Sequence, residues 1–198
     1  KGTFTVTHKA TGRTFVAGGT FPRGGGDGRV VDVPKGPLGA GRAIEIARPD
    51  GAADRLILYA DVPFVFLQAV VANGGSEPRN VPAVDLATLP LALAKPAANL
   101  KALGTAGLTA PDGHPGSYCY LVVADPRTRA GVVGAYLTHD RGTGVVFSSV
   151  ADGAVRLAPK IEYGRLLVGP GKTAETETFA LGWFADARLG QERWADLV

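Results

Sequence analysis

Glycine and proline interrupt the apolar runs of this chain so often that few long helices fit between them. Together, 28 glycines and 14 prolines make up about a fifth of the 198 residues. The apolar runs between them are short but persist throughout the sequence, unlike the composition of a disordered tail. Frequent turns between short apolar runs are typical of antiparallel sheets. We therefore predict an all-β chain in which two large antiparallel sheets pack face to face.

Alternating apolar residues place the expected strands. Phe4, Val6 and His8 alternate with threonines and form a hairpin with residues 14–16. Within residues 81–93, two prolines argue against a helix, and an apolar period of two fits better. The other expected strands are residues 42–47, 55–60, 64–72, 118–124, 132–138, 145–150, 155–157, 165–168 and 175–184. Residues 22–29 and 99–116 are expected to be loops.

Residues 131–149 contain the densest group of chemically capable side chains. Two alternating apolar runs flank a polar, glycine-rich segment that carries His139, Asp140 and Arg141. This pattern predicts a β-hairpin with the three side chains at its tip. In one interpretation, Asp140 accepts backbone N–H bonds within the turn and Arg141 pairs locally. In the other, the tip faces a sugar or another domain, since loops on a rigid scaffold often carry recognition.

Trp183 has a similar ambiguity. An exposed indole would offer a stacking surface to a sugar, whereas a tryptophan within a strand is usually part of the core. We therefore treat His139, Asp140, Arg141 and Trp183 as the candidate substrate-binding residues.

The last dozen residues form the one segment with helical character. Asp186 is a suitable N-cap, and Leu189, Arg193 and Leu197 share a face. Arg188 and Glu192 have the i,i+4 spacing of a helical ion pair. The helix reaches Val198 without a stop signal, which favours continuation into a following domain. We thus divide the chain into a sandwich domain, residues 1–185, and the start of a linker helix, residues 186–198.

Charge and composition argue against several classes of partner. The net charge of +3 is spread along the chain without a Lys/Arg-rich run, so nucleic acid is not an expected partner. No apolar run approaches the ~20 residues that span a bilayer, and no signal peptide is recognisable. Because the chain starts at Lys1 and contains no methionine, either a leader has been removed or the sequence is part of a longer one. A removed leader would favour a periplasmic or secreted location.

The motifs for cofactors, metals and catalysis are missing or incomplete. No glycine-rich loop opens a helix, and the three histidines are far apart, so we expect neither a cofactor nor a zinc site. Cys119, within an apolar run, is expected to be a buried structural thiol. Glycoside hydrolysis requires two acids that face each other across a cleft. Glu162, Glu175, Glu177 and Asp186 are available, but the sequence nominates no pair among them.

Three stretches together resemble one known family. They are DVPFVFLQAVVANGGSEP at residues 61–78, THDRGTGVV at residues 138–146, and GWFADARLGQERWADLV at residues 182–198. They are similar to the N-terminal β-supersandwich domain of α-galactosidase-like glycoside hydrolases, the family 36 and raffinose-synthase-related group. The resemblance covers nearly the whole chain. It implies that a (β/α)8 catalytic barrel follows and carries both catalytic aspartates, so no catalytic residue is expected in this chain.

Three functions remain open from the sequence. The first is a non-catalytic domain of a carbohydrate-active enzyme, which supports the barrel and contacts sugar. For the complete enzyme, the resemblance implies glycosidic cleavage of α-galactosides. The second is a stand-alone carbohydrate-binding or cell-surface module. The third is a structural protein in which the sandwich mediates subunit contacts. The helix without a stop signal favours the first.

Overall fold

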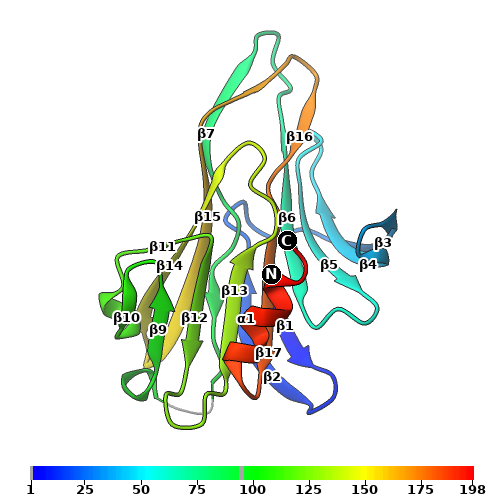
Figure 1. Cartoon of the computed structure of the whole chain (residues 1–198). Helices are drawn as coiled ribbons and strands as arrows, with labels where there is room; N and C mark the ends of the chain where they lie inside the picture. The colour runs from blue at the N-terminus through cyan, green and yellow to red at the C-terminus, as the bar shows by residue number, and fades with distance from the viewer. Residues whose placement is uncertain (1, 94–95) are drawn as a thin grey trace.

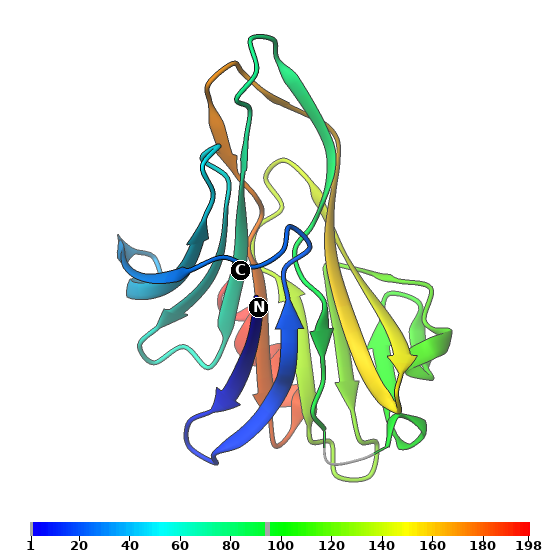
Figure 2. The same cartoon turned by 180° about the vertical axis from the view of Figure 1, so that it is seen from behind.

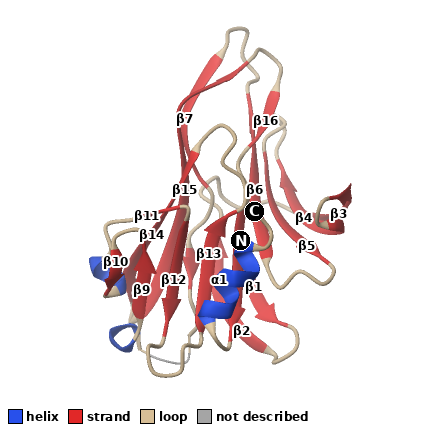
Figure 3. Ribbon diagram, in the orientation of Figure 1, coloured by secondary structure: helices blue, strands red, loops and turns tan. Residues whose placement is uncertain are grey.

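Two facing antiparallel sheets make up most of the computed structural model, which describes residues 2–93 and 96–198 (Figure 1). The all-β prediction and the short C-terminal helix are both confirmed (Figure 3). Lys1, on which the expectation of a removed leader rests, lies outside the described residues.

The larger sheet has ten strands. In spatial order they are β10 (Gly107–Thr109), β9 (Lys101–Gly104), β12 (Tyr120–Ala124), β13 (Gly131–Tyr136), β17 (Phe179–Phe184), β6 (Val65–Ala72), β5 (Ala53–Tyr59), β4 (Gly39–Ala47) and β3 (Gly28–Gly36), with β16 (Thr173–Glu175) also paired to β6. All their pairings are antiparallel.

The smaller sheet has five strands. They are β11 (Ser117–Tyr118), β14 (Thr143–Ala151), β15 (Ala154–Val168) and β7 (Arg79–Asp85), with β8 (Leu89–Pro90) also paired to β15. The predicted N-terminal hairpin, β1 (Thr3–His8) and β2 (Arg13–Thr20), is confirmed. It continues the smaller sheet through isolated bridges from Val16 to Leu91 and from Thr20 to Thr88. Figure 2 shows the hairpin in blue beside the green segment that contains β8.

The central strands of the larger sheet are covered on both faces, which explains their nearly continuous apolar sequences. Leu67, Leu121 and Leu181 on one face pack against Leu157 and Ile161 of the smaller sheet. On the other face, a second cluster packs beneath helix α1 (Ala187–Ala195); it contains Phe66, Val133, Ala180 and Ala187. Two short 3-10 helices, η1 (Ala97–Asn99) and η2 (Pro111–Gly113), complete the elements.

Helix α1 begins as the sequence predicts. The Asp186 carboxylate accepts a hydrogen bond from the backbone N–H of Arg188 at 3.1 Å. The helix then lies against β13 and β17, and the Trp194 indole N–H donates to the carbonyl of Tyr136 at 3.0 Å (Figure 1). The Arg188 side chain is hydrogen-bonded to Asp186, rather than forming the expected salt bridge with Glu192.

Several strand boundaries differ from the prediction. Residues 99–116, expected to be a loop, contain the β9–β10 hairpin. Strand β3, which follows the glycine-rich loop at residues 22–29, was not among the expected strands. The two strands expected at residues 155–157 and 165–168 are one strand, β15, with a register shift between Glu162 and Leu166. Gly164 lies in this bulge with a φ of 63°, a conformation that glycine adopts without strain.

Cys119 marks the place where the chain passes from one sheet to the other. The strand expected at residues 118–124 is interrupted there, because Cys119 has a φ of 66°. Its N–H donates to the carbonyl of Gly144 in the smaller sheet, at 2.9 Å. Its carbonyl accepts from the N–H of Tyr136 in the larger sheet, at 2.8 Å. Cys119 is partly exposed, so the expectation of a buried thiol is wrong.

Where the chain passes between the sheets at Cys119, the packing leaves no room for a side chain at Gly144. An added Cβ would lie 2.1 Å from the ring of Tyr136, which is completely buried. We expect Gly144→Ala to lower the free energy of unfolding by about 3 kcal/mol, since the ring has no space to move into. Urea unfolding of the purified variant measures this. Gly36→Ala is the matched control, because nothing lies within 4 Å of its added Cβ. Equal stability of the two variants would contradict the packing described here.

Candidate functional site

The segment that carries His139, Asp140 and Arg141 crosses between the two sheets. β13 pairs with β12 and β17, so both its edges are occupied. β14 pairs with β15 and β11 in the other sheet. The predicted hairpin over residues 131–149 is therefore wrong, because β14 has no free edge of β13 to pair with. Residues 137–142 form a crossing loop instead.

A buried carboxylate fixes this crossing loop. Glu177 is only 2% exposed and lies between β16 and β17. Its two oxygens accept hydrogen bonds from the Thr138 hydroxyl at 2.6 Å and from the Arg141 backbone N–H at 3.1 Å. The Arg141 guanidinium Nε lies 3.7 Å from the same carboxylate. A buried charge is stable only when it is paired and hydrogen-bonded, and Glu177 meets both conditions.

Arg141 is thus partly used in holding the loop. Besides its ion pair with Glu177, its side chain donates to the backbone carbonyl of Glu175. The pairing is not local in sequence, contrary to one interpretation of the segment. Sequence reasoning identified Glu177 only as an available acid. The signal that was present is the alternation of acids and threonines over residues 175–178, within a strand pattern that is otherwise apolar.

His139 and Asp140 are exposed on the crossing loop. The His139 ring lies 6.2 Å from the Tyr136 ring, measured between centroids. Across residues 2–93 and 96–198, we find no hydrogen bond to the side chain of His139 or of Asp140. In particular, Asp140 does not accept the backbone N–H bonds that the turn interpretation expects.

Trp183 is not brought together with these three residues. Its indole is 8% exposed and belongs to the core between the sheets. The ring lies 5.2 Å from the ring of His8, and the Arg13 guanidinium carbon lies 4.9 Å from its centroid. Trp183 pairs with Val132 at the start of β13, whereas the loop follows Tyr136 at the end of that strand. The two candidate positions thus lie at opposite ends of one strand pair.

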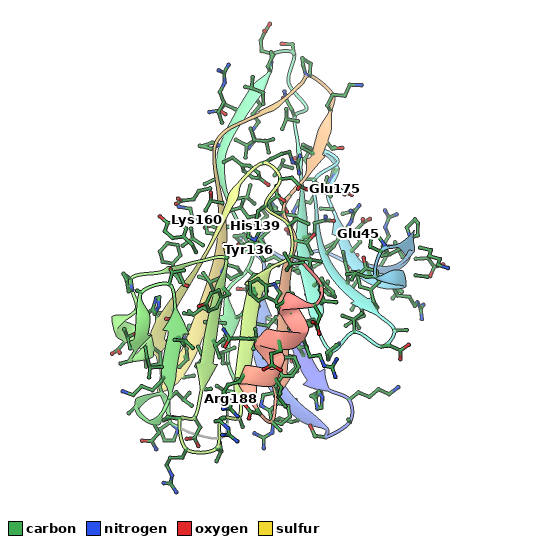
Figure 4. The ribbon with its side chains drawn as sticks, viewed as in Figure 1. Glu45, Tyr136, His139, Lys160, Glu175 and Arg188 are labelled. Atoms are coloured by element: carbon green, nitrogen blue, oxygen red, sulfur yellow. The ribbon has the colours of Figure 1, made fainter. Side chains whose placement is uncertain are left out.

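A row of alternating charges lies next to the crossing loop, on the outer face of the larger sheet. Arg29 donates to Glu45 at 2.7 Å, and Arg55 donates to the other oxygen of Glu45 at 2.8 Å. Arg55 also donates to Glu175 at 2.6 Å. Figure 4 shows Glu45 and Glu175 on the same side of His139, far from Arg188. The cross-strand register of β3, β4 and β5 places Arg29, Glu45 and Arg55 side by side.

The charge row changes the pKa values of its members. Hydrogen bonds from Arg29 and then Arg55 hold the pKa of Glu45 below its ordinary value of 4.5. Burial alone would lower the pKa of Arg55, but its hydrogen bonds to Glu45 and Glu175 raise it overall. Burial, followed by the negative charge of Glu175, raises the pKa of Tyr59.

A groove opens above this row. It has a volume of about 380 Å³, and its polar lining comes from Asp32, Glu45, Arg55, Tyr59, Gln68, Glu175 and Thr178. Leu137, the first residue of the crossing loop, lines it as well. The crossing loop and the groove are therefore parts of one surface. In the part of the chain that the structure describes, no cluster of three or more His, Cys, Asp or Glu side chains could hold a metal ion.

A second, larger groove lies on the opposite face of β3, β4 and β5. It has a volume of about 810 Å³ and is bounded by Thr5 and Thr7 of the N-terminal hairpin. Its floor is apolar, with Val30, Ile44 and Leu58 each about half exposed. We call these three residues the apolar strip. Within the described residues, no helix is long and apolar enough to cross a membrane.

We expect Glu177→Ala to lower the free energy of unfolding by about 2–4 kcal/mol. The change leaves the Thr138 hydroxyl and the Arg141 N–H without their buried acceptor. Amide hydrogen exchange at Arg141 should accelerate in parallel. Glu162→Ala is the control, since Glu162 makes only an exposed ion pair with Lys160. Unchanged exchange at Arg141 would show that Glu177 does not hold the loop.

The lowered pKa of Glu45 predicts a pH dependence. The folded protein binds a proton at this carboxylate less readily than the unfolded chain does, so the stabilisation is complete above pH 4.5 and is lost as the pH falls through the folded-state pKa. We expect Glu45→Gln to cost about 1–2 kcal/mol at pH 7. The difference from the unmodified protein should shrink steadily below pH 4.5 in urea unfolding. A difference that is constant from pH 7 to pH 3 would contradict this.

Comparisons with solved structures identify the fold. The whole chain aligns with 31% of the α-galactosidase from Lactobacillus brevis, at a TM-score of 0.60 and 13% identity. It also aligns, over 93% of its length, with 30% of a GH36 α-galactosidase from Geobacillus stearothermophilus, at a TM-score of 0.58 and 10% identity. A galactose mutarotase related enzyme from Lactobacillus acidophilus matches 87% of the chain with 76% of its own, at a TM-score of 0.54 and 13% identity.

No protein-family model matches the sequence, and no curated protein matches it. At 10–13% identity, the structural likeness is one of fold. The chain spans about a third of the length of the α-galactosidases that it matches. The resemblance stated from the sequence is thus confirmed at this level: the chain has the fold of the N-terminal sandwich domains of family 36 α-galactosidases.

Proposed function

We propose that this chain is a non-catalytic sandwich domain of an α-galactosidase-like glycoside hydrolase, which supports the catalytic domain and contacts sugar. One observation carries the proposal: the whole chain aligns with the L. brevis α-galactosidase, yet it covers only 31% of that chain. In that enzyme, the fold described here is one part of a longer chain. By resemblance, the partner is a (β/α)8 barrel that carries the catalytic aspartates.

The state of the acids supports a non-catalytic role. Glu175 is paired with Arg55, and Glu177 is buried with Thr138 and Arg141. Glu162 is paired with Lys160, and Asp186 with Arg129 and Arg188. A general acid for glycosidic cleavage must keep its proton near neutral pH, whereas the hydrogen bonds from Arg188 lower the pKa of Asp186.

The apolar strip supports contact with another domain. Leu58 and Val30 are 57% and 59% exposed, and together with Ile44 they continue the core face of the larger sheet past the edge of the N-terminal hairpin. Contiguous exposed apolar surface of this kind usually marks an interface. We assign it to the catalytic domain, since about 70% of each matched α-galactosidase lies outside the matched domain.

Sugar contact is assigned to the crossing loop. His139 and Asp140 are exposed on this loop, whose first residue, Leu137, lines the polar groove. Trp183, the fourth candidate, packs in the core and would contribute to such contact only at the other end of β17. A stand-alone carbohydrate-binding module is the second candidate function, and the presence of the polar groove favours it.

Expression of the complete reading frame that contains these residues distinguishes the enzyme domain from the stand-alone module. We expect its full product to release nitrophenol from p-nitrophenyl α-galactoside, and residues 1–198 alone to release none. In the full product, Ile44→Glu combined with Leu58→Glu should lower the melting temperature by several degrees and reduce this activity, because the charges disrupt the interface. Leu108→Glu, at an exposed leucine of β10 near the opposite edge of the sheet, is the control.

A full product without α-galactosidase activity would contradict the proposed parent enzyme. If the activity were present but the double variant behaved like Leu108→Glu, the parent would be confirmed and the interface would lie elsewhere.

A further inference from the structure

The polar groove has the volume of a small-ligand site. It lies on the outer face of the larger sheet, between β3–β5 on one side and β16 with the start of the crossing loop on the other. Ligand pockets range from about 300 to 1,000 Å³. A volume of 380 Å³ is at the lower end of this range and suits a ligand of one ring.

The groove floor offers both donors and acceptors. Arg55 uses Nε and Nη1 for Glu45, Gln68 and Glu175, and among the described residues its Nη2 has no partner. Glu175 accepts from Arg55 at Oε1, while no described residue donates to its Oε2. Tyr59 likewise makes no hydrogen bond through its hydroxyl within the described chain. Charge-assisted hydrogen bonds are the strong ones, so Arg55 and Glu175 are well suited to bind adjacent hydroxyls, and the neutral Tyr59 hydroxyl adds a further donor and acceptor.

The groove wall is apolar and fixed. Val31, Val33, Leu38 and Leu137 contribute aliphatic surface to it. The ring of Tyr59 is held edge-on against the buried ring of Phe66, with centroids 5.4 Å apart and planes at 74°. The aromatic ring thus presents a preformed surface beside the polar floor. An amphipathic ligand, with C–H groups on one side and hydroxyls on the other, matches this arrangement.

The charges that line the groove disfavour an anionic ligand. Asp32, Glu45 and Glu175 line it together with one cation, Arg55, whereas Arg29 of the charge row lies outside the lining. An anion would meet three carboxylates, and a cation would meet the Arg55 guanidinium, whose Nη2 is the donor available there. A neutral ligand that binds through several hydrogen bonds fits this lining.

We propose that this groove binds one ring of a neutral pyranose sugar, with Arg55, Glu175 and Tyr59 as its hydrogen-bonding residues. The inference rests on the proposed sugar contact and gives it a location. The crossing loop then forms one border of the sugar site, since Arg141 holds the backbone of Glu175 and Leu137 lines the groove.

Isothermal titration calorimetry of the unmodified chain with galactose, methyl α-galactoside and glucose tests this, with galacturonate as the charged comparison. We expect saturable millimolar binding of at least one neutral sugar and weaker binding of galacturonate. Glu175→Gln should weaken the binding about tenfold, since it removes the charge of one acceptor. Tyr59→Ala should abolish it. Glu162→Gln, at an exposed acid on the smaller sheet, should leave it unchanged. Thermal unfolding of each variant verifies that it is folded.

The outcomes separate the two proposals. Binding that His139→Ala abolishes, but that Glu175→Gln and Tyr59→Ala leave intact, would overturn the groove and retain sugar contact at the exposed loop. Tighter binding of galacturonate than of galactose would overturn the neutral-ligand assignment. Absence of binding to all three neutral sugars at tens of millimolar would overturn the groove and the sugar contact together. The role beside a catalytic domain would then still depend on the activity of the full product.

Discussion

The hydrogen bonds of the buried Glu177 carboxylate are the interaction on which the candidate functional surface depends. β13 has both edges occupied, so the chain must leave the larger sheet after Tyr136 and cross to the smaller one. Glu177 holds this crossing by accepting from Thr138 and Arg141. The same residue interrupts the strand pattern between β16 and β17. One desolvated charge thereby fixes both the crossing loop and the neighbouring position of Glu175.

The unequal width of the two sheets creates the remaining surface. The larger sheet has ten strands, while the smaller sheet and the N-terminal hairpin cover only part of it. Strands β3, β4 and β5 therefore extend beyond the sandwich with both faces partly open, as Figure 1 shows. One face carries the apolar strip, and the other carries the charge row of Arg29, Glu45 and Arg55. The proposed protein interface and the proposed ligand groove thus lie back to back on the same three strands.

The sequence contains enough information for the fold class but not for the strand partners. Alternation over residues 4–16 and 42–60 predicted two pairs of neighbouring strands correctly, and Asp186 was recognised as a helix cap. Alternation reports which side chains share a face, whereas pairing depends on which edges are already occupied. For this reason residues 131–149 resembled a hairpin although β13 and β14 belong to different sheets. Glu177 and the charge row were missed as a site, because their members come from strands that are distant in sequence.

The most direct test is to determine where on the domain a neutral sugar binds. Titration of the ¹⁵N-labelled chain with galactose, followed by ¹H–¹⁵N correlation spectra, maps that contact residue by residue. We predict that the shifted amides belong to β5, β16 and residues 137–141. Shifts confined to the surroundings of Trp183 and His8, or to the apolar strip, would contradict it.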